Sequence, residues 1–441
     1  MVNRFFYIWG PKSRRMIKMV LLALFYFLFP LVIIFLCRKW TFLRKFGTIV
    51  LAYAFGLIIG TAGLLPHGSE GFKFALQNEH SLSKPVLEAL IAEGKAVPDD
   101  RVVNDILALQ DAIYSLALLL AFPLLLFSLN IRRWLKFAKK GFLSVALALV
   151  AGLVMVTTGF FIWKDAFPDA WKLAGMFEGI YTGGTPNFAA LKLILNVDAD
   201  RFVVLFTYDT IIGAFLVLFF VTLAPRIFRA ILPKYEDKNG VTLDEELVKK
   251  ETEGLDDFSG MLKRKIFVPL LKALGLSLII AGISGALYMF APVPEEFRMA
   301  VMVLSVTTLG ILASLVKSIN RIEKTFQFGM YLILVFSLTV ASRSDIRTLF
   351  GQGMWDLILF ISWCYWGSLF LHLMLAKIFR IDADNFLITA TAFVFSPPFV
   401  PLVANALKNK DVIVTGLTGG VIGYLLGNYF GTTLAYLLKG F

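Results

Sequence analysis

Charged residues are scarce in this 441-residue sequence. Only 17% of its residues are Asp, Glu, Lys or Arg, whereas 58% are hydrophobic. This composition excludes an ordinary soluble domain, in which about a quarter of the residues are charged. The formal net charge is +12, but Lys and Arg cluster in short stretches beside apolar runs. Such clustering indicates membrane topology, so we expect a lipid bilayer as partner and no nucleic acid.

Cysteine and histidine are also rare. Cys37 and Cys364 both fall at or inside apolar runs, and the three histidines have no ligand-like spacing. We therefore expect no disulfide framework and no zinc site, and we interpret His372 as a packing residue. The sequence lacks a phosphate-binding loop, a nucleophile elbow and a His-Glu-x-x-His helix. These absences argue against an enzyme and against ATP-driven transport by this chain alone.

Long apolar runs dominate what is present. Each is long enough to cross a hydrocarbon core of roughly 30 Å. They lie at about 19–37, 46–65, 107–130, 141–163, 173–196, 202–225, 266–291, 299–316, 325–342, 354–378, 384–406 and 412–438. The pattern predicts an all-α polytopic protein of the inner (cytoplasmic) membrane, with about 12 transmembrane helices. Whether it forms a homodimer is left open.

Polar stretches divide the chain. Residues 1–18 mix aromatic and basic side chains, as expected of a cytoplasmic interfacial segment, and residues 226–265 form a polar linker between two six-helix halves, 19–225 and 266–441. Residues 66–105 carry seven acidic residues against four Lys or Arg, which favours an external position. The basic loop that begins at Arg132 favours the cytoplasmic side.

One apolar run contains a sequence that a membrane helix should not tolerate. Gly183 and Gly184 weaken the helix, and Pro186 removes a backbone donor. Non-helical backbone at membrane depth survives only where it is buried in protein or lines a watery cavity. Polar side chains accumulate at the same place, namely Tyr181, Thr182, Thr185 and Asn187. The run predicts a broken helix of the kind that transporters use to bind substrate and ion, although a kink that only shapes packing is the alternative.

The two halves share an order of short motifs. Residues 123–129 (Pro-Leu-Leu-Leu-Phe-Ser-Leu) have an echo at 333–338, and the break at 183–187 has one at 396–401. This order indicates a duplication. An inverted repeat needs an odd number of crossings between equivalent helices, whereas the apolar runs give six. We therefore expect one hidden or re-entrant segment.

Several motifs together resemble a known family. These are Pro-Leu-Leu-Leu-Phe before a basic loop, Tyr-Thr-Gly-Gly-Thr-Pro-Asn-Phe, Tyr208-Asp209-Thr210, and the glycine-spaced segment 423–431 near the end. They resemble the YjcL-like integral membrane proteins, an uncharacterised bacterial family catalogued as domain of unknown function 819. That family looks distantly similar to the bile-acid/sodium symporter and sodium/proton antiporter superfamily, which implies two crossing discontinuous helices. The second break departs from the family pattern, which weakens the case for a sodium site there.

Acidic residues inside spans are the remaining candidates, because an ionised Asp at the centre of a membrane helix costs about 3 kcal/mol. Asp209 is the first candidate, with Asn187 as a second ligand if Na⁺ binds. Glu178 is a second carboxylate, a proton carrier, the partner of Lys192 or a residue at the membrane interface. Asp111 is either functional or a boundary residue. Ser396 and Asn405 are weaker candidates at the second break.

These observations predict a secondary active transporter that works by alternating access. Half-helix N-termini favour a small anionic or zwitterionic solute, and carboxylates favour coupling to Na⁺ or H⁺. A cation/proton antiporter is the alternative within transport. An intramembrane enzyme or a structural membrane subunit is the alternative from another class.

Overall fold

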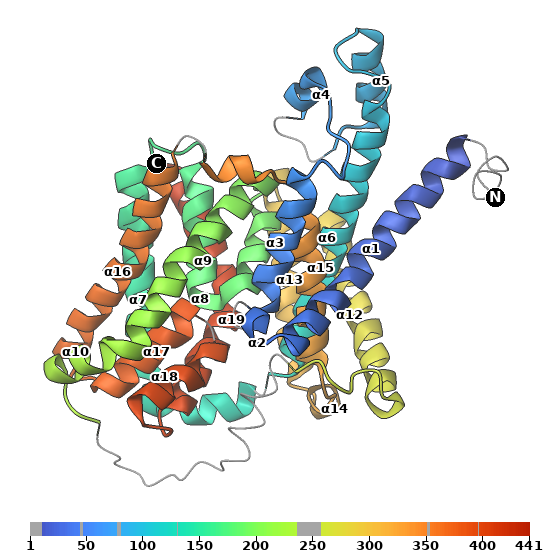
Figure 1. Ribbon diagram of the computed structural model, residues 1–441. Coiled ribbons are helices and arrows are strands. Elements are labelled where there is room, and N and C mark those ends of the chain that lie inside the picture. Colours follow the sequence, from blue (N-terminus) through green and yellow to red (C-terminus); the bar gives the residue numbers. More distant parts are fainter. Residues whose placement is uncertain are drawn as a thin grey trace. The chain divides into compact units, whose positions relative to one another are not determined.

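Helices account for all the regular structure in the residues that the computed structural model describes, which are 11–44, 47–76, 81–129, 131–235, 257–350, 353–395 and 397–441 (Figure 1). In chain order the elements are α1 (Pro11–Lys39), α2 (Thr41–Arg44), α3 (Thr48–Thr61), α4 (Glu70–Ala75), α5 (Lys84–Ala92), α6 (Asp100–Phe127), α7 (Ile131–Trp163), α8 (Ala170–Ile194), α9 (Ala199–Thr222), α10 (Ala224–Ile231), α12 (Arg264–Phe290), α13 (Glu295–Ser314), α14 (Lys317–Asn320), α15 (Thr325–Ala341), η2 (Ile346–Phe350), α16 (Met354–Ile378), α17 (Ala383–Phe395), η3 (Pro397–Phe399), α18 (Val400–Leu407) and α19 (Ile413–Leu438).

Eight of these helices are long and apolar enough to cross a membrane, counted over the described residues: α1, α6, α7, α9, α12, α13, α16 and α19. Three shorter apolar helices, α3, α15 and α17, have 14, 17 and 13 residues. The chain is therefore an all-helical, multi-pass integral membrane protein. The count of twelve spans is not supported, and the duplication and the inner membrane stay predictions.

Two compact units divide the chain. The first comprises residues 1–118, 198–204 and 331–350, and the second comprises 119–197, 205–330 and 351–441. Three of the five boundaries fall within helices, namely α6, α9 and α15. Because each unit combines segments from both predicted halves, this division does not test them.

A small helical module in the first unit occupies the acidic stretch that we expected to be a polar interruption. Apolar side chains from α4, α5 and the beginning of α6 form a core that includes Phe72, Leu87 and Val103. Asp100 fixes the start of α6, since its carboxylate accepts hydrogen bonds from Ser69 N at 2.9 Å and Val97 N at 2.8 Å. The helix consequently begins seven residues before the predicted apolar run.

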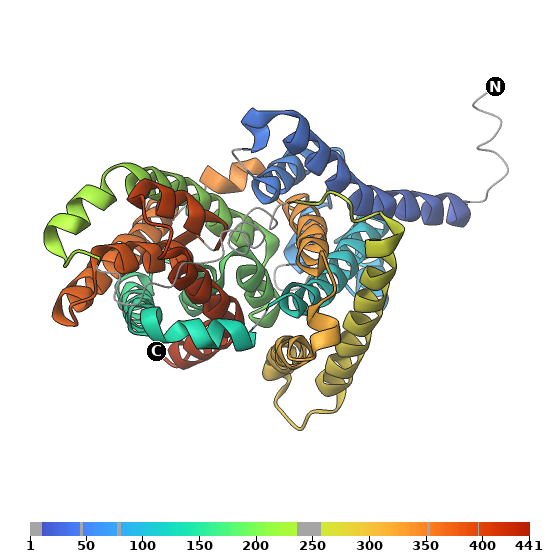
Figure 2. The same cartoon turned by 90° about the horizontal axis from the view of Figure 1, so that it is seen from below.

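Helix α19 organises the second unit. It contacts α7, α8, α13, α17 and α18. In Figures 1 and 2, α10, α17 and α18 lie next to one another in this unit. Glycines spaced four residues apart on α19, at 419, 423, 427 and 431, allow its neighbours to approach closely.

The chain of α8 turns back on itself at Gly184. This residue has φ 64° and ψ −162°, outside the helical region. A Cβ added to Gly179 would overlap the Leu191 side chain. In an unbroken helix those two positions would be about 18 Å apart. A Cβ added to Gly431 would likewise lie 2.7 Å from Gly175 O and 2.5 Å from Leu191 Cδ1.

Residues 170–194 therefore form a helical hairpin, which we call the first hairpin. Its two arms run antiparallel on either side of Gly184. The expectation of a membrane span at 173–196 was wrong, because the tight turn at a glycine reverses the chain instead of kinking it. The arms extend about 15 to 20 Å, roughly half of a bilayer core.

Residues 383–407 form a second hairpin. Helix α17 ends at Phe395, and after η3 the chain returns as α18. Asn409 Nδ2 donates a hydrogen bond of 2.9 Å to Asp384 Oδ2, although a continuous helix would separate these residues by about 37 Å. The predicted span at 384–406 was therefore wrong as well. Ser396, predicted to lie at this turn, falls outside the described residues.

The polar linker is partly helical. Its first residues form α10, where Ala224 and Phe228 are buried, while residues 236–256 lie outside the described part. At its other end, Lys324 Nζ donates a hydrogen bond of 2.8 Å to Asp257 and lowers the pKa of that carboxyl to about 2. The predicted interfacial segment 1–18 is described only from Pro11, where α1 begins.

Candidate functional site

The glycine face of α19 shows where the two hairpin tips lie. Near the N-terminal end of this helix, a Cβ on Gly416 would lie 2.7 Å from Val400 in the second hairpin. Near the C-terminal end, Gly431 touches both arms of the first hairpin. The tips meet the helix between these points, Pro397 at Gly420 and Thr182 O at Gly423.

The two hairpins therefore lie along opposite ends of α19, and their tips approach it near its middle. Gly420 and Gly423 are about 4.5 Å apart along the helix axis. This arrangement brings the two breaks close together on one helix. It differs from two crossing discontinuous helices, which the family resemblance implied, because each broken segment reverses direction.

Asn187 is the polar anchor of the first tip. Its Nδ2 donates to Gly423 O at 3.2 Å and to Tyr424 O at 3.4 Å. Its Oδ1 is buried and has no hydrogen-bond partner among the described residues. Thr182 Oγ1 instead donates to Glu178 O at 2.7 Å, within its own arm. The tip thus presents one acceptor that its own fold does not satisfy.

A small cavity of about 10 Å³ lies beside this tip, which is room for roughly one water molecule. Its lining comes from four elements of the second unit: α6, α8, the first turn of α15 and α19. The lining residues are Phe122, Leu125, Leu126, Leu129, Pro186, Asn187, Phe326 and Tyr424. Because Pro186 and Asn187 line this cavity, it adjoins the turn of the first hairpin.

Asp209 is held by a tyrosine. Tyr365 OH on α16 donates a short hydrogen bond to Asp209 Oδ1. The Tyr365 ring also packs against Phe177 and Tyr181 of the first hairpin, with centroid distances of 5.0 Å and 6.3 Å. Asp209 is therefore linked to an arm of the hairpin through one aromatic side chain, whereas no contact joins it to Asn187, its predicted Na⁺ partner, in the described part of the chain.

Glu178 lies in that same arm and is fully buried. Neither of its carboxylate oxygens accepts a hydrogen bond from any described residue, so the predicted pairing with Lys192 is not formed. Its electrostatic neighbours are Tyr181 and Cys364. Cys364 and Tyr365 are consecutive on α16, so Glu178 and Asp209 both lie near the same turn of that helix.

The other predicted site residues are dispersed. Tyr181 points away from the cavity, since its ring stacks on Phe393 at 6.1 Å and its hydroxyl donates to Ala148 O at 3.4 Å. Thr185 is partly exposed at the tip, and Asn405 is exposed on α18. Cys37 and Cys364 are both buried, and the His372 ring packs 4.6 Å from Phe386.

Asp111 belongs to the first unit and is a structural ion-pair residue there. It forms a short contact with Arg343. The Arg343 guanidinium also lies 6.0 Å from the centre of the Tyr114 ring. The pairing with Arg343 explains why the acidic residue Asp111 lies near the beginning of an apolar run.

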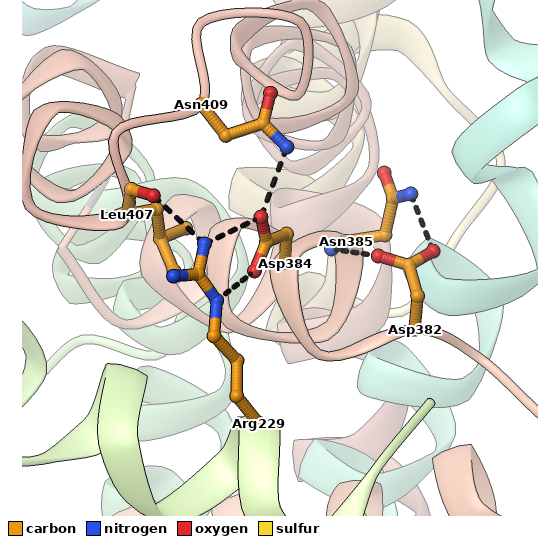
Figure 3. A network of polar contacts seen from close by, with 6 residues as sticks. All are labelled: Arg229, Asp382, Asp384, Asn385, Leu407 and Asn409. Atoms are coloured by element: carbon orange, nitrogen blue, oxygen red, sulfur yellow. Dashed lines mark hydrogen bonds and ion pairs between the residues drawn. The ribbon is translucent and has the colours of Figure 1, made fainter. Parts of the chain in front are cut away.

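A network of polar contacts closes the base of the second hairpin (Figure 3). Arg229 of α10 donates two hydrogen bonds of 2.8 Å to the carboxylate of Asp384, and a third of 2.7 Å to Leu407 O. Asp384 begins α17 and Leu407 ends α18, so one guanidinium holds both ends of the hairpin. Pro233 O adds a backbone hydrogen bond from Ala383 N at 3.0 Å.

Sequence reasoning missed this network and most of the cavity. Arg229 lies 155 residues before Asp384, inside a stretch that composition describes only as a charged linker. The leucines and aromatic residues of the cavity resemble any other membrane-helix residues. A usable signal was the spacing of the α19 glycines, since it marks a helix face that other backbones approach.

Comparison with known proteins identifies the family of this chain. The family model described as "Protein of unknown function (DUF819)" matches residues 103–441. The chain is also 23% identical over 341 residues to a Bacillus subtilis (strain 168) protein named "Uncharacterized membrane protein YjcL", a match that covers 75% of this chain and 84% of that one. The family match extends over all of the second unit. The chain therefore belongs to the DUF819 family of membrane proteins.

Proposed function

We propose that this protein is a secondary active transporter that binds a small solute at the tip of the first hairpin and releases it by alternating access. The observation that carries the proposal is the reversal of α8 at Gly184 beside a small cavity. Non-helical backbone at membrane depth is tolerated where it is packed in protein or lines a cavity. Transporters place their binding sites at such positions near the bilayer midplane.

The arrangement along α19 supports the same proposal. Two hairpins approach one helix from opposite ends and stop near its middle. A solute at the tips would then be separated from each side of the membrane by only one hairpin. Small movements of either hairpin against α19 would open the site to that side.

The hairpins also bear on the predicted duplication, for which the apolar runs gave six crossings although an inverted repeat needs an odd number. If α8 does not cross the membrane, the crossings that lead from α6 to its equivalent α15 are α6, α7, α9, α12 and α13. Five is an odd number, as an inverted repeat requires. The re-entrant segment that the parity argument demanded is then the first hairpin.

Ion coupling is assigned to Glu178 and Asp209. An unpaired buried carboxylate costs too much free energy to stay charged without a partner, so Glu178 suits a group that takes up and releases a proton. Asp209 suits either H⁺ or Na⁺. A cation/proton antiporter is the second candidate, and the full burial of Glu178 without a hydrogen-bond partner favours it.

Cysteine accessibility tests alternating access without knowledge of the substrate. Thr185→Cys, in a chain whose Cys37 and Cys364 are replaced by serine, places one thiol at the first tip. We expect a membrane-impermeant maleimide to label it in both right-side-out and inverted vesicles. Leu278→Cys, on an exposed face of α12, is the matched control and should stay unlabelled in lipid.

The outcomes separate the classes of function. Labelling of Thr185→Cys from both sides supports a transporter. Labelling from one side only indicates a fixed cavity, which suits an intramembrane enzyme. Absence of labelling from either side would contradict a water-accessible site and favour a structural subunit.

A further inference from the structure

Glu178 lies where nothing compensates a negative charge. Its side chain is fully buried in the arm of the first hairpin that precedes Gly184, and neither carboxylate oxygen accepts a hydrogen bond from a described residue, Lys192 of the other arm included. Its ionisable neighbours are Tyr181 and Cys364, which supply no positive charge.

The helices packed on α8 supply none either. Residues 141–163 of α7, 299–314 of α13 and 413–438 of α19 include no Asp, Glu, Lys, Arg or His, and on α17 the one such residue, Asp384, is held by Arg229. A charged carboxylate buried without a partner is strongly destabilised, whereas the neutral acid is not. The site of Glu178 therefore favours its protonated form.

Asp209 is built to hold a proton and not Na⁺. Transporters bind Na⁺ with several oxygens at once, many of them carbonyls of unwound backbone. Helix α9 is continuous around Asp209, so its carbonyls stay within the helix, and the neighbouring Thr210 Oγ1 donates to Phe206 O at 2.8 Å. Within the described ranges, the hydrogen bond from Tyr365 OH is the one polar contact of the Asp209 carboxylate.

Tyr365 connects the two acidic residues. Its hydroxyl binds Asp209, and its ring packs against Phe177 and Tyr181, the aromatic residues on either side of Glu178 in the same arm. Any movement of the Tyr365 ring would therefore change the packing that keeps water away from Glu178.

We propose that the coupling ion is H⁺ and that Tyr365 is the positioning residue that links its two carriers, Asp209 and Glu178. While Asp209 is ionised, its hydrogen bond from Tyr365 is charge-assisted and about twice as strong as a neutral one, so the ring stays in place and Glu178 keeps its proton. When Asp209 takes up a proton from water, this bond weakens and the ring loosens. Water then reaches Glu178, which releases its proton to water.

One O–H bond thus forms at Asp209 for each that breaks at Glu178. This inference rests on the proposed function, because it names the coupling ion and a positioning residue of the same transporter.

Infrared spectroscopy tests the state of Glu178 directly. The purified full-length chain is measured at neutral pH in dodecyl maltoside micelles, which contain no carbonyl group. We expect a carboxylic-acid C=O band at the high-frequency end of its range, as for an acid without a hydrogen bond. The band should disappear in Glu178→Gln and persist in Glu93→Gln, which changes an exposed acidic residue. Absence of the band from the wild type would overturn the inference.

Cys364 reports whether Tyr365 keeps this region closed, because it is buried beside Glu178. In a chain with Cys37→Ser, we expect dithiodipyridine to modify Cys364 about fivefold faster in Asp209→Asn and in Tyr365→Phe than in the parent, the effect of weakening one hydrogen bond to a charged group. Tyr436→Phe is the matched control, since it removes a tyrosine hydroxyl that donates to Glu296 O at 2.9 Å. Its rate should equal that of the parent.

The pH profile separates positioning from simple packing. In the parent, acidification should speed modification of Cys364 relative to that of an exposed thiol, Asp165→Cys. Asp209→Asn and Tyr365→Phe should both lose this dependence, whereas a tyrosine that only packs would leave it intact. Replacement of Na⁺ by K⁺ should change no rate.

The inference is overturned by a pH dependence that survives Tyr365→Phe, by a parent rate that does not depend on pH, or by a rate that depends on Na⁺. These measurements use purified protein in micelles, without a solute or two membrane sides. They are therefore independent of the labelling of Thr185→Cys in vesicles, so a wrong coupling ion and a wrong function are distinguishable.

Discussion

Gly184 adopts a backbone conformation that side-chain-bearing residues avoid. With φ 64° and ψ −162°, it lies in a region that is essentially restricted to glycine and costs other residues about 1–3 kcal/mol. The reversal of the first hairpin therefore depends on this position more directly than on Pro186. A proline alone would kink the helix.

We expect Gly184→Leu to abolish solute binding at the first tip while the protein still inserts into the membrane. The strain is confined to the turn, whereas the spanning helices are unaffected. Solute binding to the purified variant and its size-exclusion chromatography measure the two effects. Gly213→Leu, on α9 where a Cβ would meet nothing within 4 Å, is the control, and wild-type binding by Gly184→Leu would show that the turn does not need glycine.

Asp209→Asn and Glu178→Gln separate the two candidate coupling residues. Each substitution keeps the side-chain shape and removes the ability to release a proton. We expect the variant of the coupling residue to lose the dependence of solute flux on Na⁺ or pH, while flux driven by the solute gradient persists. Flux in proteoliposomes over a range of Na⁺ and pH measures this dependence. If both variants respond as the wild type does, neither carboxylate couples transport.

Side-chain chemistry made several of these residues recognisable in the sequence, but it did not reveal which residues they contact. A buried Asp in an apolar run is costly wherever it lies, so Asp209 could be selected without a structure. Its partner Tyr365 lies 156 residues away and looks like any other aromatic residue in a membrane helix. The free acceptor of Asn187 could not be foreseen, because it depends on which carbonyls of α19 take the other end of the amide.

At the scale of elements, close approach between α8 and α19 depends on single glycines. A Cβ on Gly423 would overlap Thr182 O and lie 2.9 Å from Thr182 C. Since both atoms are backbone, neither can move without shifting the first hairpin. Gly275 on α12 has nothing within 4 Å of the same added atom.

We therefore expect Gly423→Ala to lower the melting temperature, whereas Gly275→Ala is neutral or slightly stabilising. Alanine favours a helix over glycine by about 1 kcal/mol, so the control change has the opposite sign. Thermal unfolding in nanodiscs measures both. Equal behaviour of the two variants would show that α8 and α19 do not approach as closely as described.

The base of the second hairpin depends on a charge-assisted network. Asp384 is almost fully buried and accepts from both Arg229 and Asn409. A hydrogen bond to a charged group contributes about 1.5–3 kcal/mol, and the half exposure of Arg229 places this pair at the lower end.

We expect Asp384→Asn to weaken the packing between the end of α18 and the beginning of α17, and to lower the melting temperature. Hydrogen exchange of the amides at 405–411 should accelerate, because that segment loses its attachment to α10. Asp382→Asn is the control, since Asp382 contacts only the nearby Asn385 among the residues drawn in Figure 3. Unchanged exchange in Asp384→Asn would assign the base of the hairpin to backbone contacts alone.

The sequence could predict where α8 and the segment 384–406 break, but not what each break does. Glycine and proline weaken a helix in the same way whether the two halves continue, cross or fold back. The direction is decided by packing of both arms on one residue of a distant helix, as Gly175 and Leu191 do on Gly431. The local amino-acid composition does not indicate that contact.

At the scale of the whole molecule, the hairpins change the predicted topology. Ten of the twelve expected apolar runs coincide with helices that are long enough to span or with the short apolar helices α3 and α15. The other two runs, at 173–196 and 384–406, fold as hairpins instead of single helices. Each hairpin begins and ends at the same end of α19. Because the two bases lie toward opposite ends of that helix, they should face opposite sides of the membrane.

Single cysteines beside the hairpins test this topology, again with Cys37 and Cys364 replaced by serine. Asp165 and Asn196 flank the first hairpin, and Lys377 and Lys410 flank the second. We expect an impermeant maleimide to label Asp165→Cys and Asn196→Cys from one side of the membrane, and Lys377→Cys and Lys410→Cys from the other. A segment that crosses would put the two members of its pair on different sides. Labelling of Asp165→Cys and Asn196→Cys from opposite sides would thus restore α8 as a span and return the crossings between α6 and α15 to six, which an inverted repeat cannot have.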